Sequence, residues 1–380
     1  MSRVLILGGG FGGLSAAHAL RLALAATDEV VLVERQPTFV MGLRKSWALV
    51  GSGDLAGGER RLDVLTGRGI EVVTGEISAI EPEAKAAVVD GRRLAGDALI
   101  VALGAARAPE SIPGFAEHVH DVYERSSLAR AAEALRSTKG GAIAIGIFGV
   151  PYTCPPAPYE MAFLVSDLLR RRGVPARVEV FTPQPMSLPV IGQAGCDVLE
   201  ARLSEEGIDF HPNHQALAVE PGEVVFSGGR GRFDLLLGVP PHRCPAVAAS
   251  AGLTDGGSWV KVDPSTMETR FPGVYAIGDL VEIPLANKMM LPKAGVFAES
   301  QAQVAAEHIS AALSGGGPAA AAFNGQGYCY LEVGRGLAME VRGDFLAAPA
   351  PAVSIGAALA SRLNEKRDFE ATRLKKWFGA

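Results

Sequence analysis

The amino-acid sequence predicts an α/β protein of two Rossmann-like domains, the second inserted into the first, followed by a short C-terminal segment. Apolar strands at residues 3–7 and 140–149 are each followed by a turn and by apolar residues at helical spacing. A third apolar strand, in "TRFPGVYAIGD", lies far downstream but fits the first domain by its pattern. These strand–turn–helix units and the returning strand indicate the fold class.

The same pattern divides the chain into three parts. The first domain comprises residues 1–110 and 246–315, the second comprises residues 111–245, and the C-terminal segment comprises residues 316–380. The two crossings between the domains lie in "IPG" and "PPHRCP". Proline favours such linkers because its φ is fixed and it has no backbone N–H.

The first strand leads into a glycine-rich turn. Gly8 permits the turn, Gly10 lets the backbone approach a pyrophosphate, and Gly13 lets the helix pack closely on the strand. The next strand, "EVVLVE", ends in Glu34, where a carboxylate can accept hydrogen bonds from an adenosine ribose. This spacing indicates a dinucleotide cofactor.

Two further segments fit one cofactor in particular. "DALIVALGA", with Gly104, and "YAIGD", with Gly278 and Asp279, resemble the later fingerprints of the glutathione-reductase-like flavoproteins. In those proteins the aspartate contacts the ribityl chain of the flavin. The resemblance implies that this chain binds FAD. A single NAD-binding unit would not explain the distant "YAIGD" segment.

The turn of the second domain, "GVPYTCPPAPYE", lacks the glycine spacing of a phosphate loop. Its three prolines remove backbone hydrogen-bond donors. The following strand, "ARVEVFTP", ends without the acidic residue that binds the ribose of NAD or the arginine that binds the 2′-phosphate of NADP. Nicotinamide binding is therefore disfavoured. Cys154 occupies this loop, just before a helix that we expect Pro158 to begin, where the helix dipole would lower the pKa of the thiol. A packing role for this cysteine is the alternative.

"CPPAPYE", "MLPKAGVFAESQAQVAAEHI" and "GYCYLEVG" together resemble the sulfide:quinone oxidoreductase and flavocytochrome c sulfide dehydrogenase flavoprotein family. The resemblance implies a redox-active disulfide between Cys154 and Cys329 beside the flavin. Hydrosulfide would attack one sulfur to give a persulfide and a thiolate, and the thiolate would reduce FAD. The donor would be sulfide or a small thiol, and the acceptor a quinone.

The same match suggests roles for two charged residues. Glu160 would accept a proton if burial raises its pKa, or it would simply favour the helix N-terminus. Lys293, in "LPKAG", would place positive charge near the flavin. The segment "PTFVMGLRKSWALVG" lacks the cysteine that attaches FAD in flavocytochrome c relatives, so we expect FAD to be non-covalent. The third cysteine of many sulfide:quinone oxidoreductases is also missing between residues 105 and 150.

Composition excludes several other classes. The net charge of −5 argues against a nucleic-acid partner, and the four cysteines show no metal-ligand spacing. Of these, Cys196 and Cys244 are expected to be buried core residues. No apolar run approaches the roughly 20 residues that span a bilayer. The pattern of the first ten residues predicts a core strand. We expect a cytoplasmic protein, soluble or peripheral to the membrane.

The last residues, "AALASRLNEKRDFEATRLKKWFG", predict a helix with one apolar face. That face would carry Leu359, Leu363, Leu374, Trp377 and Phe378, and Arg367 and Glu370 interrupt it. The basic residues beside it are Arg362, Lys366, Arg373, Lys375 and Lys376. Such a helix suits a membrane interface, but it also suits a homodimer contact or docking onto the FAD domain.

Two other functions compete with sulfide oxidation. One is a type II NADH:quinone oxidoreductase, whose family shares the "PKAGVFA" block in outline. The other is a flavoprotein subunit that works only with a cytochrome or a sulfur carrier.

Overall fold

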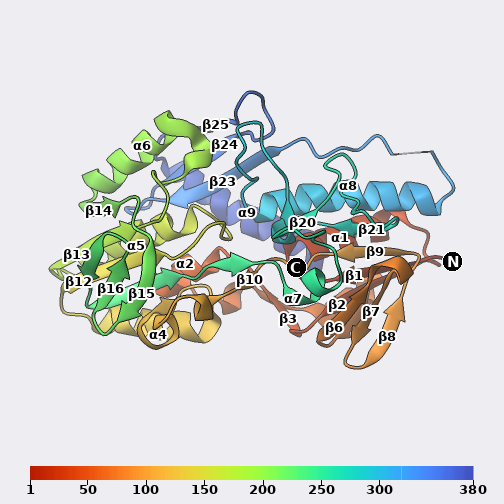
Figure 1. Ribbon diagram of the computed structural model, residues 1–380, viewed down its shortest axis with the longest axis horizontal. Coiled ribbons are helices and arrows are strands. Elements are labelled where there is room, and N and C mark those ends of the chain that lie inside the picture. The colour runs from red at the N-terminus through yellow and green to blue at the C-terminus, as the bar shows by residue number, and fades with distance from the viewer. Residues whose placement is uncertain (318, 380) are drawn as a thin grey trace.

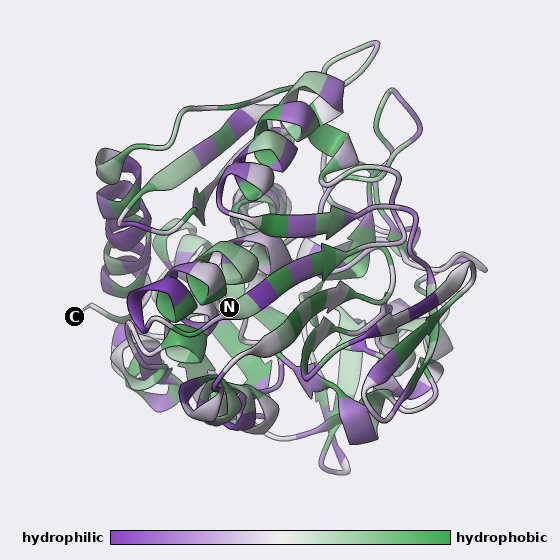
Figure 2. Cartoon of the chain, turned by 90° about the vertical axis from the view of Figure 1, so that its left-hand side faces the viewer, coloured by the Kyte–Doolittle hydropathy of each residue, from purple (hydrophilic) through white to green (hydrophobic). Residues whose placement is uncertain are grey.

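The structure is a computed structural model that describes residues 1–317 and 319–379. Residues 318 and 380, which the predicted C-terminal segment includes, lie outside the described residues. Two five-stranded parallel sheets form the centres of the fold (Figure 1), so the predicted α/β class with two Rossmann-like sheets is confirmed. Apolar residues follow the strands of these sheets in Figure 2.

The first sheet has the strand order β21–β9–β1–β2–β5, and all of its strands are parallel. Strand β21 pairs with β9, so the downstream "VYA" completes a sheet that the N-terminus begins. The interior residues of β1 are fully buried, as expected for a parallel sheet covered on both faces. The bounds are β1 Arg3–Leu7, β2 Glu29–Glu34, β5 Glu71–Thr74, β9 Ala98–Val101 and β21 Val274–Ala276.

Helices α1, Phe11–Ala23, and α8, Gly295–Leu313, pack against each other beside this sheet (Figure 1). A small antiparallel sheet lies nearby and consists of β6, Ile77–Glu81, β7, Ala86–Val89, and β8, Arg92–Ala95.

The second sheet has the order β11–β18–β12–β13–β14 and is also parallel. Its strands are β11 His120–Asp121, β12 Gly141–Ile147, β13 Ala176–Phe181, β14 Ile208–His211 and β18 Leu235–Val239. The long helices of this part are α4 Arg125–Ser137, α5 Ala157–Arg171 and α6 Gly192–Glu205. An antiparallel sheet of β15 Ala216–Glu220, β16 Glu223–Phe226 and β17 Gly229–Arg232 packs against the second sheet, where Phe226 meets Phe181 of β13.

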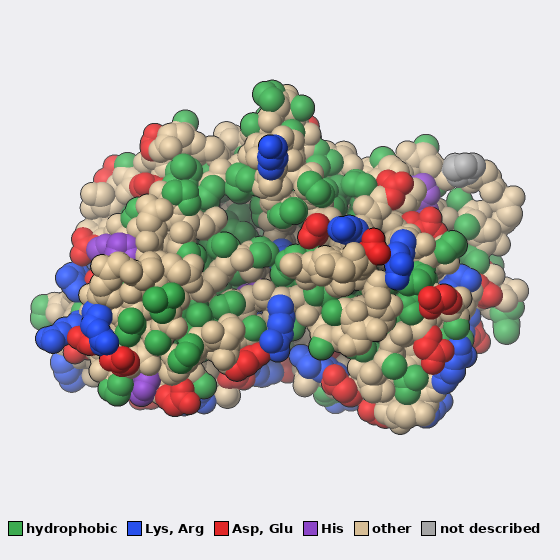
Figure 3. All heavy atoms as spheres, viewed as in Figure 1, with side chains coloured by type: hydrophobic (Ala, Val, Ile, Leu, Met, Phe, Trp, Pro, Cys, Tyr) green, Lys and Arg blue, Asp and Glu red, His purple; other side chains and the backbone are tan. Residues whose placement is uncertain are grey.

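The C-terminal part is an antiparallel sheet followed by a helix. Its elements are β23 Gln326–Glu332, β24 Ala338–Asp344, β25 Ala352–Ile355 and α9 Ala360–Phe378. The remaining short elements are α2 Arg44–Val50, α3 Phe115–His118, α7 Ala246–Ser250, β3 Thr38–Val40, β4 Glu59–Arg61, β10 Ala106–Arg107, β19 His242–Arg243, β20 Val260–Lys261 and β22 Val281–Glu282. None of the helices in the described chain is long and apolar enough to cross a membrane. Acidic and basic side chains are interspersed on the face in Figure 3.

Helix α9 turns most of its predicted apolar face inward, which agrees with docking onto the first domain, one of the three roles that the sequence pattern allows. Trp377 is 1% exposed and meets the rings of Phe11 and Phe39 edge to face, at centroid distances of 5.0 and 5.5 Å. Of the predicted apolar face, only Leu359 is exposed, at 47%. The outer side of the helix, which leads to the label C in Figure 2, is mostly hydrophilic. The helix therefore docks on the first sheet's domain.

We expect Trp377→Ala to lower the free energy of unfolding by about 3–5 kcal/mol, because it leaves a cavity among buried aromatic rings. Leu359→Ala, at the exposed residue just before the same helix, should change it by less than about 0.5 kcal/mol. Denaturant unfolding followed by circular dichroism measures both. Equal stability of the Trp377→Ala variant and the wild type, with loss of vesicle binding, would restore the membrane interpretation.

Candidate active site

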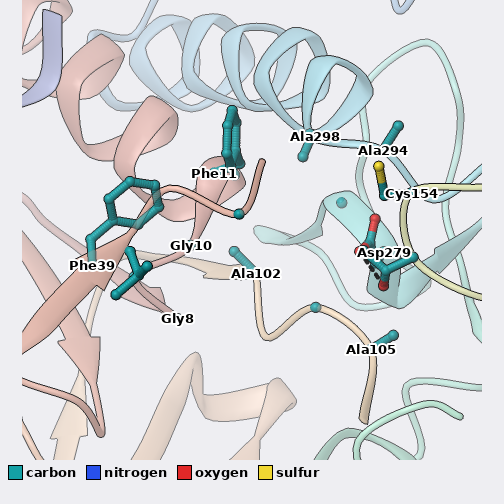
Figure 4. A pocket seen from close by; sticks show the side chains of 18 of the residues that line it. Gly8, Gly10, Phe11, Phe39, Ala102, Ala105, Cys154, Asp279, Ala294 and Ala298 are labelled. Atoms are coloured by element: carbon teal, nitrogen blue, oxygen red, sulfur yellow. Dashed lines mark hydrogen bonds between the residues drawn. The ribbon is translucent and has the colours of Figure 1, made fainter. Parts of the chain in front are cut away.

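A cavity of about 650 Å³ runs between the glycine-rich turn of the first domain and the cysteine-bearing loop of the second. In Figure 4, Gly8 and Gly10 lie at one end, and Cys154 and Asp279 lie at the other. Its lining includes Gly8, Gly9, Gly10, Glu34, Lys45, Gly104, Tyr123, Thr153, Cys154, Glu160, Gly278, Asp279, Tyr328, Cys329, Lys366 and Phe369. Most of the residues that the sequence singled out therefore border one space.

The glycine-rich turn is shaped by close backbone contacts. Gly8 has φ +106°, and a Cβ placed there would lie 2.4 Å from the Ala102 carbonyl oxygen. A Cβ at Gly13 would lie 1.7 Å from the Gly8 carbonyl oxygen, so only glycine lets helix α1 approach the turn. A Cβ at Gly10 would meet nothing within 4 Å, which leaves the backbone open to a ligand. This is the cradle that a pyrophosphate needs.

Glu34 ends strand β2 at the rim of this cradle. Its Oε2 accepts a hydrogen bond from the Gly9 N–H at 2.7 Å, and its Oε1 accepts one from the Gln36 N–H at 3.1 Å. The carboxylate is thereby fixed toward the cavity, in a place that suits the ribose of a dinucleotide.

Asp279 lies at the other end of the cavity. Its Oδ2 accepts a hydrogen bond from Thr153 Oγ1 at 2.9 Å, which ties it to the cysteine loop. Burial raises the pKa of Asp279, while the Thr153 hydrogen bond and Lys293 oppose that rise. The adjacent Gly278 donates its N–H to Gln301 Oε1 at 2.7 Å. Gly104 has φ +65° and no atom within 4 Å of an added Cβ.

Lys293 lies behind the cavity lining, next to Asp279, and its expected role near the flavin stays a prediction. Its Nζ donates to the Asp279 carbonyl oxygen at 2.5 Å and lies 3.3 Å from the centroid of the Trp259 ring. Burial lowers the pKa of Lys293 to about 8. The backbone carbonyl of this residue accepts a hydrogen bond from the Cys154 N–H at 2.7 Å, so Lys293 acts in this structure as a support for the cysteine loop.

The Cys154 backbone adopts the left-handed conformation, with φ +55°, which is uncommon for a residue other than glycine. Its carbonyl oxygen accepts a hydrogen bond from the Ala157 N–H at 2.9 Å, and the Tyr123 hydroxyl donates to the Thr153 carbonyl oxygen at 2.8 Å. Helix α5 begins at Ala157, one residue before the expected Pro158. These contacts fix the loop and turn the thiol into the cavity (Figure 4).

The thiol of Cys154 is not acidified, so the expectation from the helix dipole is wrong. Its surface is exposed to the cavity, deep within the protein. Burial raises its pKa to about 12, Glu160 and Asp279 add to the rise, and Lys366 opposes it. Desolvation of the thiolate outweighs the helix dipole at this position.

Cys329, in strand β23, lines the same end of the cavity. Burial raises the pKa of its thiol, and the neighbouring Cys154 and Glu160 raise it further, which reflects the proximity of the two cysteines. Both are free thiols in the structure. The fold thus brings together two cysteines that lie far apart in the sequence, whereas Cys196 and Cys244 are buried, as predicted.

A buried ion cluster lies behind the two thiols. Lys366 of helix α9 is 3% exposed, and its Nζ lies 2.7 Å from Glu160 Oε2 and 2.9 Å from Glu332 Oε1. The Glu332 N–H also donates to Glu160 Oε2 at 2.9 Å, and Trp47 Nε1 donates to Glu332. Burial opposes the charge of Lys366, but the two carboxylates outweigh it and raise its pKa.

The sequence pattern places Lys366 only among the basic residues beside the apolar face of this helix, so it does not predict the buried role. A lysine in a helix rich in charged residues gives no sign that it is buried. The burial of Lys366 depends on two glutamates that lie far away in the sequence. No group of three His, Cys, Asp or Glu side chains in the described part of the chain is arranged to hold a metal ion.

Comparison with known proteins places this geometry in context. Residues 2–308 match the family model described as pyridine nucleotide-disulphide oxidoreductase. The mitochondrial sulfide:quinone oxidoreductase of Dictyostelium discoideum is 26% identical over 307 residues, which are 76% of this chain and 67% of that protein. An NADH dehydrogenase-like protein of Mycobacterium tuberculosis is 28% identical over 247 residues, 60% of each chain.

Among solved structures, the sulfide:quinone oxidoreductase of Aquifex aeolicus superposes with a TM-score of 0.90 at 22% identity. The superposition covers 100% of this chain and 92% of that one, and it shows that the two share a fold.

We expect Lys366→Met to lower the free energy of unfolding by about 3–5 kcal/mol, because it leaves Glu160 and Glu332 as buried charges without a partner. Lys375→Met, which removes an exposed charge from the same helix, should change it by less than about 0.5 kcal/mol. Adding Glu160→Gln to Lys366→Met should recover part of the loss. Equal stabilities of the two single variants in denaturant unfolding would show that the ion cluster does not hold the helix.

Proposed function

Because the chain belongs to the pyridine nucleotide-disulphide oxidoreductase family, we propose that it is an FAD enzyme that oxidises sulfide, or a related thiol or persulfide, and passes the electrons to a quinone. The observation that carries the proposal is the convergence of Cys154 and Cys329 at one end of a cavity whose other end is a phosphate cradle. The sulfide:quinone relatives agree with this assignment.

The residues present fit FAD. Gly10 leaves the cradle open, Glu34 lies where the ribose would bind, and Gly104, Gly278 and Asp279 border the path toward the thiols. Non-covalent binding of FAD stays the expectation from the sequence, in which "PTFVMGLRKSWALVG" has no cysteine. When bound, FAD supplies a two-electron acceptor that is reoxidised by the quinone.

The sulfur chemistry belongs to the two cysteines. Hydrosulfide attacks one sulfur of the Cys154–Cys329 disulfide, so that an S–S bond to the incoming sulfur forms and the bond between the cysteines breaks. The products are a persulfide on one cysteine and a thiolate on the other. Transfer of the outer sulfur to a nucleophilic acceptor leaves two thiols, and their reoxidation to the disulfide releases two electrons and two protons.

The ion cluster stabilises the thiolate that forms in these steps and accepts a proton. A departing thiolate in this buried place needs a nearby cation, and Lys366 opposes the rise in the pKa of both cysteines. Glu160 contacts Lys366 and borders the cavity, so we assign it as the acceptor of a proton from the sulfur substrate or its persulfide.

An aromatic wall beside Cys329 supports a quinone as the electron acceptor. Phe369 stacks on Phe11 at a centroid distance of 6.1 Å and meets Tyr328 edge to face at 6.0 Å. All three line the cavity, and flat aromatic faces suit a quinone ring. A quinone dissolved in a bilayer would be reached by a peripheral protein, and exposed apolar side chains such as Val150 and Met290 fit that placement.

Anaerobic mixing with sulfide should bleach the flavin absorbance of the wild type, and Cys154→Ser or Cys329→Ser should slow this reduction by at least about 100-fold. Both substitutions break the disulfide that hydrosulfide must attack. Cys244→Ser is the matched control, because this buried cysteine does not line the cavity, and it should keep the wild-type rate.

Unchanged reduction in both cavity variants would discard the disulfide mechanism. Bleaching of the wild type by NADH, with none by sulfide, would instead establish the alternative function of a type II NADH:quinone oxidoreductase, the name that another relative carries.

A further inference from the structure

Lys45, in helix α2, lines the same cavity as Cys154 and has no role in the chemistry described so far. Its Nζ donates a hydrogen bond to the Tyr123 carbonyl oxygen at 2.9 Å and lies 5.2 Å from the centroid of the Tyr123 ring. The hydroxyl of the same tyrosine binds the backbone of the cysteine loop, at the Thr153 carbonyl oxygen. Tyr123 thus binds both Lys45 and the cysteine loop.

The positive charge of Lys45 is not neutralised by a carboxylate. The ammonium carries three N–H donors, of which the Tyr123 carbonyl accepts one. Among the described residues it forms no ion pair, and the neighbouring Asp121 is paired with Arg107 at 2.5 Å. Lys366 differs in this respect, because Glu160 and Glu332 both compensate its charge. Of the two lysines on the cavity wall, Lys45 is the one that can attract an anion.

We propose that Lys45 binds the sulfur substrate as the hydrosulfide anion and delivers it to the disulfide, and so acts as a specificity-determining residue. This rests on the proposed function, since it names how that substrate is held. A half-buried, uncompensated cation draws anions more strongly than one in bulk water, because the effective dielectric constant is lower. Neutral small thiols gain nothing from it, and hydrosulfide is therefore preferred.

The groups that face Lys45 set the pH range of this effect. Burial, followed by Arg107, lowers the pKa of Lys45 to about 8, while Asp121, Cys154 and Glu124 oppose the change. The nearby His242 has its pKa lowered to about 4, mainly by burial, so it is neutral in this range. Lys45 is charged below about pH 8 and loses its charge above it, and the attraction for anions falls in the same range.

Alkylation of Cys154 in a Cys329→Ser background tests the charge without turnover. The probes are iodoacetate, an anion, and iodoacetamide, its neutral counterpart, and peptide mapping identifies the modified cysteine. A change in the reactivity of the thiolate alters both rates equally, so the ratio of the two rates reports attraction of the anion alone. At pH 7 we expect Lys45→Gln to lower this ratio roughly tenfold.

Two controls sharpen the test. Lys45→Arg keeps the charge at all accessible pH values, so its ratio should stay high where the wild-type ratio falls through about pH 8. Lys139→Gln removes an exposed charge that does not line the cavity and should leave the ratio at the wild-type value. An unchanged ratio in Lys45→Gln, or an equal loss with both reagents, overturns the proposal.

Steady-state kinetics then separate this proposal from the broader one. In the enzyme with both cysteines, Lys45→Gln should raise KM for sulfide roughly tenfold at pH 7 with kcat changed less than about twofold. A wild type that is not reduced by sulfide sinks the proposed function, whereas normal reduction with an unchanged KM in Lys45→Gln sinks only the role of Lys45.

Discussion

The active-site end of the cavity depends on the buried ion cluster of Glu160, Lys366 and Glu332. Each charge loses its hydration on burial, and the short contacts of 2.7 and 2.9 Å to Lys366, with the hydrogen bonds from the Glu332 N–H and Trp47 Nε1, offset that loss. The three residues come from helix α5, helix α9 and strand β23. The second domain and the C-terminal segment therefore cannot separate without exposing or orphaning a charge, and both cysteines lie on elements that this cluster joins.

Helix α2 adds the first domain to the same junction. Within its first turn, Arg44 pairs with Glu370 of helix α9 at 2.5 Å, and Lys45 binds the carbonyl of Tyr123 in the second domain. Trp47 donates to Glu332 of the ion cluster. One short helix thus contacts all three parts of the chain at the cavity wall. The site is defined by these contacts between parts, and no single domain contains it.

This arrangement explains what the sequence could and could not predict. Gly8, Gly13 and the buried parallel strands follow from local rules of turn and packing, and the α/β class followed from them. The proximity of Cys154 and Cys329 came only from a family resemblance, because spacing along a chain carries no information on such contacts. Lys366 and Lys45 were missed because each follows or precedes another charged residue, and such lysines are usually exposed. The expected lowering of the Cys154 pKa was wrong because it considered the helix dipole and left out the desolvation of the thiolate.

The unequal compensation of the two lysines has a consequence for the order of events. Lys366 is held between two carboxylates, so its charge contributes little attraction at a distance and acts only on a thiolate formed beside it. Lys45 is uncompensated, so its field extends into the cavity before any bond breaks. With the pKa of Cys154 raised to about 12, a free thiolate is rare at neutral pH. Negative charge must therefore enter with the substrate. Lys45 attracts the anionic substrate into the cavity, and Lys366 stabilises the thiolate that forms when the disulfide breaks.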